Sequence, residues 1–416
     1  MSFPSDHHIP TLVSLFSGAG GLDIGLERSG FHTVSANDFD ANCVATLRAN
    51  QAAEVPVAGE PGRSHFAGTL IVHAPVESLD ASDLMPVPWH SGRRLDALVG
   101  GPPCQPFSSA GSQRGVHDPR GRLFEQFVRL AEELRPRLIL FENVRGLVTA
   151  RGPKGISGEA LHLVRDEFER IGYRTRFSLL NAADYGAPQR RVRLFMLAAD
   201  EGVTLPAFPL PTHHRPRPGQ LLPLEGRFWT TLGEFLADQT PPALDEIVRP
   251  SSQLEADLRG VPGGSGLKSP GRSEPTRPGG HWGYKQGTFV ADPSLPARTV
   301  TGASTQDWIR EPDGSLRRLT LKEAAGLQGF PLDWQFCGSR ASQFLQIGNA
   351  VPIVFGEVLG AAMRQALLTP CHHPQQSHAF PADMWAAIDY ANRDDARNGA
   401  VRPRSPRFGL QSTASD

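Results

Sequence analysis

The stretch that decides the fold is TLVSLFSGAGGL, residues 11–22, in which an apolar run ends in a glycine-rich turn. Thr11–Phe16 has the composition of a buried strand, and the glycines that follow allow a tight turn into a helix. Helical patterns such as Leu123–Leu134 separate further apolar runs. These runs are predicted strands at Thr33–Asn37, Leu95–Val99, Arg137–Glu142, Thr175–Leu180 and Val192–Leu197. Alternating strands and helices predict an α/β fold with a doubly wound, mostly parallel sheet.

Composition places the chain among globular proteins. Its 416 residues are 39% hydrophobic with a net charge of −1, which excludes a generally basic nucleic-acid coat. The four cysteines include no Cys-x-x-Cys pair, so neither a zinc site nor a disulfide framework is predicted. We find no signal peptide and no apolar run of membrane-spanning length, and we therefore expect a cytoplasmic protein without a membrane partner.

The composition and the hydrophobic pattern of the sequence change near residue 200. Residues 11–200 are predicted to form a catalytic, cofactor-binding domain, whereas 201–339 are rich in proline and glycine and predict a small irregular region. Regular patterns return at Leu319–Leu327 and in a helix at Pro352–Leu368, and residues 340–368 are expected to rejoin the first domain. The tail, 369–416, is expected to be largely disordered apart from a short helix at Pro381–Ala391.

A nucleotide-type site is predicted at the glycine turn. Asp38 ends the second strand twenty residues after Gly18, where an acid can accept hydrogen bonds from ribose hydroxyls. Phe39 could stack on an adenine ring. This pattern indicates an adenosine-containing cofactor and does not separate NAD from S-adenosylmethionine.

A second site is predicted at the end of Leu95–Val99, where the chain continues GGPPCQPFS, residues 100–108. A cysteine just beyond a strand's carboxyl end stands where open α/β sheets bind ligands, which favours a nucleophilic Cys104 over a buried thiol. Glu142 ends another apolar strand, and partial desolvation would raise its pKa. Arg191 and Arg193 share one face by the two-residue period. A capping glutamate and a solvated arginine cluster are the alternatives.

Together these groups suit addition chemistry on a pyrimidine. C5 becomes nucleophilic only after a group adds to C6, as a Cys104 thiolate would. Glu142 would protonate or hydrogen-bond N3 while Arg193 binds O2, and the resulting enamine would take a methyl group at C5. Loss of the C5 proton would then release the enzyme.

Six motifs in a fixed order resemble the DNA (cytosine-5)-methyltransferase family. They are FSGAGG (Phe16–Gly21), GGPPCQPFS (Gly100–Ser108), FENV (Phe141–Val144), QRRVR (Gln189–Arg193), RTVTG (Arg298–Gly302) and QIGNAVP (Gln346–Pro352). The resemblance implies a Rossmann-like methyltransferase sheet with a smaller, irregular target-recognition domain. It also implies S-adenosyl-L-methionine as the cofactor and double-stranded DNA as the partner, with the target base flipped out of the duplex.

The resemblance also assigns individual residues. It implies Cys104 as the nucleophile, Glu142 as the N3 partner, and Arg191 and Arg193 as substrate-binding arginines. Gln105, Ser108 and Arg120 belong to a segment, 105–121, that resembles a mobile loop closing over DNA. The implied cofactor site consists of Phe16, Gly18, Gly20, Gly21, Asp38, Phe39, Leu123 and Asn349. No metal is expected.

Two expectations stay open. The family usually has an acid at the end of the third strand to hold the adenine amino group. Residues 73–76 lack one, although Glu77, Asp80 and Asp83 follow. The adenine-binding acid is therefore unassigned. Base contacts are expected from residues 201–297, whose candidates are Arg215, Arg217, Arg227, Arg272, Arg277, Phe228, Trp229, Trp282 and Tyr284.

Two other functions compete with DNA methylation. A tRNA cytosine-5 methyltransferase shares the fold and the motifs, but its Cys-Phe-Thr tripeptide is not found here. A non-catalytic regulatory homologue would have lost Cys104, Glu142 or the glycine turn, and all are present. The sequence therefore predicts a DNA methyltransferase that acts as a monomer, in restriction–modification beside a cognate endonuclease or as a solitary modifier.

Overall fold

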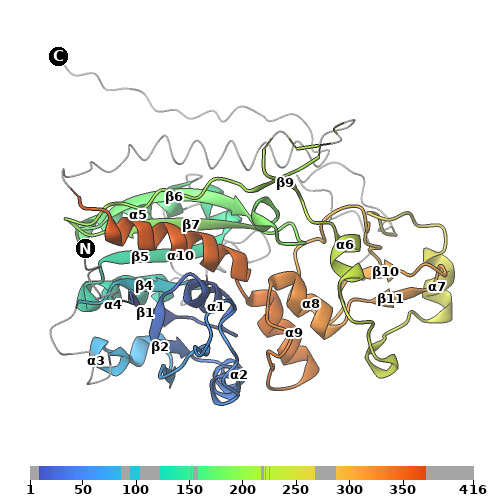
Figure 1. The fold of residues 1–416 in the computed structure, drawn as a ribbon, viewed down its shortest axis with the longest axis horizontal. Coiled ribbons are helices and arrows are strands. Elements are labelled where there is room, and N and C mark those ends of the chain that lie inside the picture. Colours follow the sequence, from blue (N-terminus) through green and yellow to red (C-terminus); the bar gives the residue numbers. More distant parts are fainter. Residues whose placement is uncertain are drawn as a thin grey trace, which may run out of the picture.

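The computed structural model describes residues 9–85, 94–103, 122–150, 152, 158–216, 220, 222–223, 225–267 and 287–371. Its centre is a seven-stranded sheet in the order β3-β2-β1-β4-β5-β7-β6 (Figure 1). The strands are β1 (Thr11–Leu15), β2 (His32–Asp38), β3 (Leu70–His73), β4 (Ala97–Gly100), β5 (Leu138–Val144), β6 (Arg174–Asn181) and β7 (Val192–Ala199).

The sheet is mostly parallel, as the sequence predicted. Strands β1 to β5 pair in parallel, and β7 runs antiparallel to its neighbours β5 and β6. Each of the six predicted strands overlaps an observed one. The apolar pattern did not predict β3, and only the family resemblance placed the end of a third strand near residues 73–76. This strand has four residues and lies at the sheet edge, where Leu70 is 40% exposed. Such a strand lacks the long apolar run that marks the buried ones.

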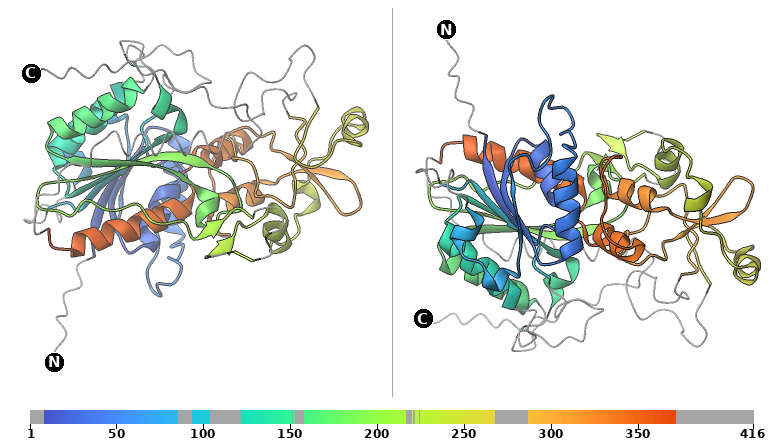
Figure 2. Two further views of the ribbon diagram at one scale, coloured as in Figure 1. Left: turned by 90° about the horizontal axis from the view of Figure 1, so that it is seen from above. Right: turned by 90° about the horizontal axis from the view of Figure 1, so that it is seen from below.

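Helices cover both faces of the sheet (Figure 2). They are α1 (Gly21–Arg28), α2 (Ala41–Ala52), α3 (Ala81–Leu84), α4 (Arg122–Leu134), α5 (Glu159–Arg170) and α10 (Ile353–Leu368). Alternation along β1 divides the core: Leu12 packs with α1 and α10, whereas Val13 packs with α4 and α5. The predicted apolar face of α4 is confirmed, because Phe127 and Leu130 are fully buried in the second of these clusters.

Helices α1 and α10 pack in unusually close contact. A Cβ on Gly25 would lie 2.1 Å from the carbonyl oxygen of Ile353, and one on Gly356 would lie 2.3 Å from that of Leu22. Only glycine allows backbones to approach this closely. The contact brings the last described helix back to the first, so that residues 350–351 lie beside the glycine turn.

The chain between β7 and α9 forms a smaller, mostly irregular part, at the right in Figure 1. Two small sheets pair β8 (His213–His214) with β9 (Arg227–Phe228) and β10 (Trp308–Arg310) with β11 (Leu316–Arg318). Its helices are α6 (Leu232–Ala237), α7 (Ser252–Leu258) and α8 (Leu321–Gln328), followed by α9 (Arg340–Asn349). A cluster that includes Leu232, Val300 and Leu327 also contains Leu47 of α2, so this part packs against the sheet domain.

One apolar stretch, Arg340–Leu368, has the length and composition to cross a membrane, which corrects the expectation that no run is long enough. Within the fold, 61% of its most apolar window is buried, as in a core helix. Ala350–Pro352 also interrupts the helix between α9 and α10. The predicted tail helix at Pro381–Ala391 lies outside the described residues.

Candidate active site

A cavity of about 520 Å³ opens at the carboxyl ends of β1, β2, β4 and β5. This is the edge at which parallel α/β sheets bind ligands, and the volume suits a nucleoside-sized molecule. The glycine turn, the ends of β2, β4 and β5, the start of β7 and residues 342–351 all contribute to its wall. The sites predicted separately from the sequence therefore form one cavity.

The glycine turn owes its shape to left-handed backbone conformations. Phe16 has a φ of 57°, and Gly18 and Gly20 have values of 56° and 85°. Phe16 and Gly18 line the cavity. Gly20 and Gly21 are not among its lining residues: a Cβ on Gly20 would lie 3.0 Å from Leu47, and one on Gly21 would lie 2.4 Å from the Val351 carbonyl oxygen. These two glycines permit close packing behind the turn.

Asp38 connects the turn to the end of β2. One carboxylate oxygen accepts from the Gly18 amide at 2.8 Å and the other from the Asp40 amide at 2.9 Å. Burial raises the pKa of Asp38, and these two amides oppose the shift. Each oxygen keeps a second lone pair for a ligand hydroxyl. Phe39 is 67% exposed at the cavity, so its ring is available for stacking.

Glu142 and Arg193 form an ion pair in the cavity, with Nε of Arg193 3.1 Å from Oε1 of Glu142. They come from adjacent antiparallel strands, β5 and β7. Glu142 is 8% exposed, and burial raises its pKa against the opposing charges of Arg193 and Arg191. This environment is the partly desolvated one expected for Glu142 from the sequence.

Arg191 lines the same cavity but has a different environment. It is 1% exposed, and its guanidinium donates to the carbonyl oxygens of Val300, Gly348 and Ala350 at 2.8, 2.8 and 2.9 Å. It therefore ties the start of β7 to the RTVTG and QIGNAVP segments. The two-residue period correctly placed Arg191 and Arg193 on one face and could not show that their partners differ.

The remaining expected residues divide into three groups. Asn349 is exposed at the end of α9 and lines the cavity. Leu123 packs against the core of α4 and α5 and is not among the lining residues. Cys104, Gln105, Ser108 and Arg120 lie outside the described residues.

The chain leading to Cys104 is nevertheless fixed. Pro103, the residue before the cysteine, lines the cavity, and Nδ2 of Asn143 donates to the Pro102 carbonyl at 3.1 Å. Asn143 was not among the predicted site residues. Its signal was its place directly after Glu142 at the end of an apolar strand, where a polar side chain can anchor a neighbouring strand end.

The acids after β3 do not reach the cavity. Asp83 accepts from the Asp80 amide at 2.9 Å at the start of α3, and neither residue is among those that line the cavity. Within the described residues, the lining acids are Asp23, Asp38, Asp40 and Glu142. The adenine-binding acid stays unassigned.

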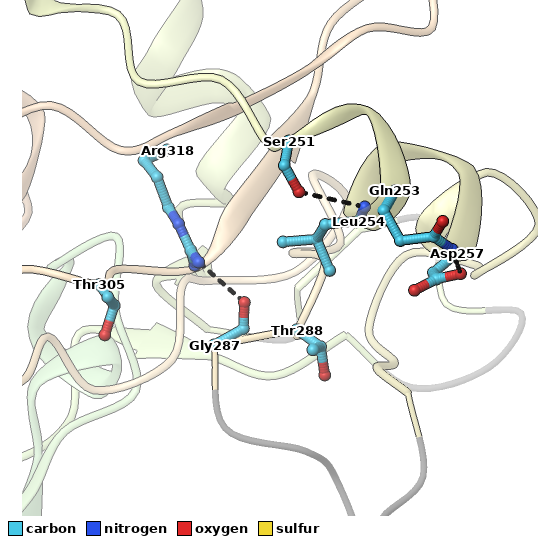
Figure 3. A pocket seen from close by; sticks show the side chains of 8 residues that line it. All are labelled: Ser251, Gln253, Leu254, Asp257, Gly287, Thr288, Thr305 and Arg318. Carbon is cyan, nitrogen blue, oxygen red and sulfur yellow. Dashed lines mark hydrogen bonds between the residues drawn. The ribbon is translucent and has the colours of Figure 1, made fainter.

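A second, more open hollow of about 530 Å³ lies in the smaller part (Figure 3). Arg318 on its wall stacks 3.5 Å from the Trp308 ring and donates to the Gly287 carbonyl at 2.8 Å. Trp229, an expected base contact, is 8% exposed and donates to Asp184, which lies between β6 and β7, so its side chain joins this part to the sheet domain.

Comparison with known proteins identifies the family. The C-5 cytosine-specific DNA methylase family matches residues 11–60 and 90–365. Type II methyltransferase M.PspPI of Psychrobacter sp. is 32% identical over 86% of this chain and 79% of its own, and M.FnuDI of Fusobacterium nucleatum is 28% identical over 86% and 94%.

Solved structures with the same fold include S. pombe Dnmt2 methyltransferase, with a TM-score of 0.57 and 16% identity over 86% of this chain and 98% of its own. Entamoeba histolytica methyltransferase EhMeth has a TM-score of 0.58 and 14% identity over 87% and 100%. At these identities the similarity shows the fold alone. The family match and the curated relatives go further: the chain belongs to the C-5 cytosine-specific DNA methylase family.

Proposed function

We propose that this protein methylates C5 of a cytosine within a specific double-stranded DNA sequence, through a covalent bond between Cys104 and C6. The supporting observation is the Glu142–Arg193 ion pair, 3.1 Å long, in the same cavity as Pro103, the residue before Cys104. An acid, a cation and a thiol are the groups needed to polarise a pyrimidine while a nucleophile adds to it.

The Cys104 thiolate bonds to C6 and breaks the C5–C6 double bond, while Glu142 donates a proton to N3 and Arg193 holds O2. C5 of the resulting enamine takes the methyl group. A base then removes the C5 proton, and the electron pair restores the double bond and expels the thiolate. N3 returns its proton to Glu142, which leaves neutral 5-methylcytosine.

The cofactor is S-adenosylmethionine, as family membership dictates; it supplies the methyl group and leaves as S-adenosylhomocysteine. The cavity fits such a molecule, because its volume is about 520 Å³ and Phe16, Gly18, Asp38 and Phe39 line it. We propose that Asp38 binds the ribose hydroxyls, that Phe39 stacks on adenine, and that Asn349 lies near the methionine end.

We assign Arg191 a positioning role, because its guanidinium donates to three backbone carbonyls. Those of Gly348 and Ala350 belong to residues that line the cavity, and that of Val300 belongs to the neighbouring RTVTG segment. Gln105, Ser108 and Arg120 are proposed to contact DNA from a loop that closes over the flipped base. Leu123 and the glycines Gly20 and Gly21 would support the cofactor site from behind.

We further propose that residues 11–200 and 340–368 form the catalytic domain and that 201–339 read the target sequence. Arg215, together with Arg227 and Phe228 of β9, is a described candidate for base or phosphate contacts. The relatives named above are type II methyltransferases, which supports a place in restriction–modification with a cognate endonuclease. We expect a cytoplasmic monomer.

The test is methyl transfer from labelled S-adenosylmethionine to unmethylated genomic DNA and to total tRNA, with Cys104→Ala as the control. Label in DNA alone, absent with the variant, supports the proposal, and sequencing of the methylated cytosines then identifies the target. Label in tRNA alone would refute DNA methylation and identify the protein as a tRNA cytosine-5 methyltransferase. Retained transfer by Cys104→Ala would refute the covalent step, and no label in either acid would favour a regulatory homologue.

A further inference from the structure

Asp23 is a buried carboxylate that the proposed reaction does not use. It lies in the first turn of α1, is 0% exposed, and lines the same cavity as Asp38 and Asn349. Within the described part of the chain, neither of its oxygens has a partner at full hydrogen-bond distance and angle, although the Ser14 hydroxyl is close enough to stabilise the carboxylate. Buried carboxylates are normally paired with a cation or with several donors. Asp23 has neither, so it offers an acceptor to a ligand bound in the cavity.

The charges around Asp23 are negative. Burial is the largest cause that raises its pKa, to about 7, and the carboxylates of Glu27 and Asp38 raise it further. The Ser14 hydroxyl on β1 opposes the shift. Glu27 is itself occupied, because its Oε2 lies 2.8 Å from Nδ1 of His65. A cation brought into this part of the cavity would therefore find Asp23 as its available counter-charge.

We propose that Asp23 is the counter-ion of the α-ammonium group of the bound cofactor. The assignment rests on the proposed function, in which this cavity holds S-adenosylmethionine. That molecule carries two cationic groups, the sulfonium and the α-ammonium. The sulfonium bears the methyl group and must face the target base beside Glu142 on β5, whereas Asp23 lies near Ser14 on β1, with β4 between these strands. The ammonium is the cation left for Asp23.

Two ligands isolate this interaction. S-adenosylhomocysteine carries the ammonium but no sulfonium, and 5′-methylthioadenosine keeps the adenine, ribose and thioether but lacks the amino acid. In titration calorimetry of the full chain at pH 7.5, Asp23→Asn should lower the affinity for S-adenosylhomocysteine at least tenfold. The affinity for 5′-methylthioadenosine should change less than twofold.

Asp40→Asn is the matched control, because Asp40 lines the same cavity and its carboxylate already accepts from the Asn42 and Cys43 amides. Asparagine keeps an acceptor for this helix cap. This variant should change the affinities for the two ligands by the same factor. Wild-type protein that binds neither ligand would overturn the proposed function itself, and the assignment of Asp23 with it.

Other outcomes separate the assignment from the proposed function. Wild-type binding of S-adenosylhomocysteine that Asp23→Asn leaves unchanged would overturn the assignment alone. An equal loss of affinity for both ligands would also overturn the assignment, because it indicates a general change in the cavity. A loss confined to S-adenosylmethionine would place the carboxylate at the sulfonium and overturn the ammonium pairing.

The pH dependence of binding gives an independent readout. A bound ammonium favours the ionised form of Asp23, so the affinity of wild type for S-adenosylhomocysteine should rise from pH 6 to 7.5. The rise should be absent for 5′-methylthioadenosine and for Asp23→Asn with either ligand. A rise that persists in Asp23→Asn would assign the titration to another group, such as Asp38, and overturn the proposal. Thermal unfolding at pH 8, with a midpoint no lower than that of wild type, shows that the variant is folded.

Discussion

Gly101 and Glu142 are packed so closely that a Cβ added to Gly101 would lie 2.6 Å from Oε2 of Glu142. The glycine therefore leaves room for the carboxylate at the point where β4 ends and the chain turns toward Cys104. Side chain and backbone come from adjacent strands, β4 and β5, which pair in parallel. The position of the proposed N3 partner thus depends on the absence of one methyl group.

Gly101→Ala should slow methyl transfer by roughly 100-fold. The added methyl group would displace the Glu142 carboxylate, and a misplacement of about 1 Å can reduce the rate of a catalysed step by this factor. Single-turnover assays with saturating DNA and cofactor measure the effect. The affinity for S-adenosylhomocysteine should change little. An unchanged rate would show that Glu142 can move without cost and would contradict its proposed role.

Glu142→Gln should lower turnover by about 100-fold or more, since an amide cannot supply the proton to N3. Covalent attachment to a duplex containing 5-fluorocytosine should survive, because the thiol is untouched and fluorine blocks the final elimination. Gel retention under denaturing conditions detects the adduct. Failure of the variant to form it would make Glu142 essential for addition itself.

The pH profile of the same reaction should follow Glu142. Burial raises the pKa of this carboxyl, so its protonated form persists to higher pH than in an exposed glutamate. Wild-type turnover should therefore fall as the pH rises through that raised pKa. The alkaline limb should disappear in Glu142→Gln; a limb of the same position and depth in both proteins would assign the titration elsewhere.

Arg191→Met and Arg193→Met should separate stability from rate. Arg191→Met removes a donor from three buried carbonyls, of which that of Ala350 still accepts from Gln328 at 3.2 Å. The free energy of unfolding should fall by about 3 kcal/mol. Arg193→Met should cost far less stability and mainly reduce turnover. Urea denaturation and steady-state kinetics on both variants make the comparison, and equal loss of stability would contradict the distinction.

Gly25→Ala should weaken the contact between α1 and α10, because its Cβ would lie 2.1 Å from the Ile353 carbonyl oxygen. We expect a loss of about 1–3 kcal/mol in unfolding free energy together with weaker cofactor binding, since residues 350–351 would shift from the glycine turn. Gly260→Ala is the control, because a Cβ there meets nothing within 4 Å. Similar behaviour of the two variants would exclude this contact as the cause.

Local pattern predicted much of the fold. The apolar runs of β1, β4 and β5 end in glycines or polar residues that stop the strand, so strand and turn are visible without a neighbour. The apolar pattern missed the short edge strand β3 because its side chains are only partly buried, and only the family resemblance placed its end near residues 73–76. The reversed direction of β7 was also invisible, since direction depends on which strand it pairs with.

The sequence by itself determined the α/β class, the cluster of chemical groups at the strand ends and the family. Only the tertiary structure decided which groups meet. Arg191 reaches carbonyls 109, 157 and 159 residues away, whereas Arg193, two residues further on, pairs with Glu142. Asp23 lies one helical turn from Glu27 in the same sequence, yet only packing removes it from solvent without a partner. Local periodicity records which face a side chain occupies; long-range packing determines what that face meets.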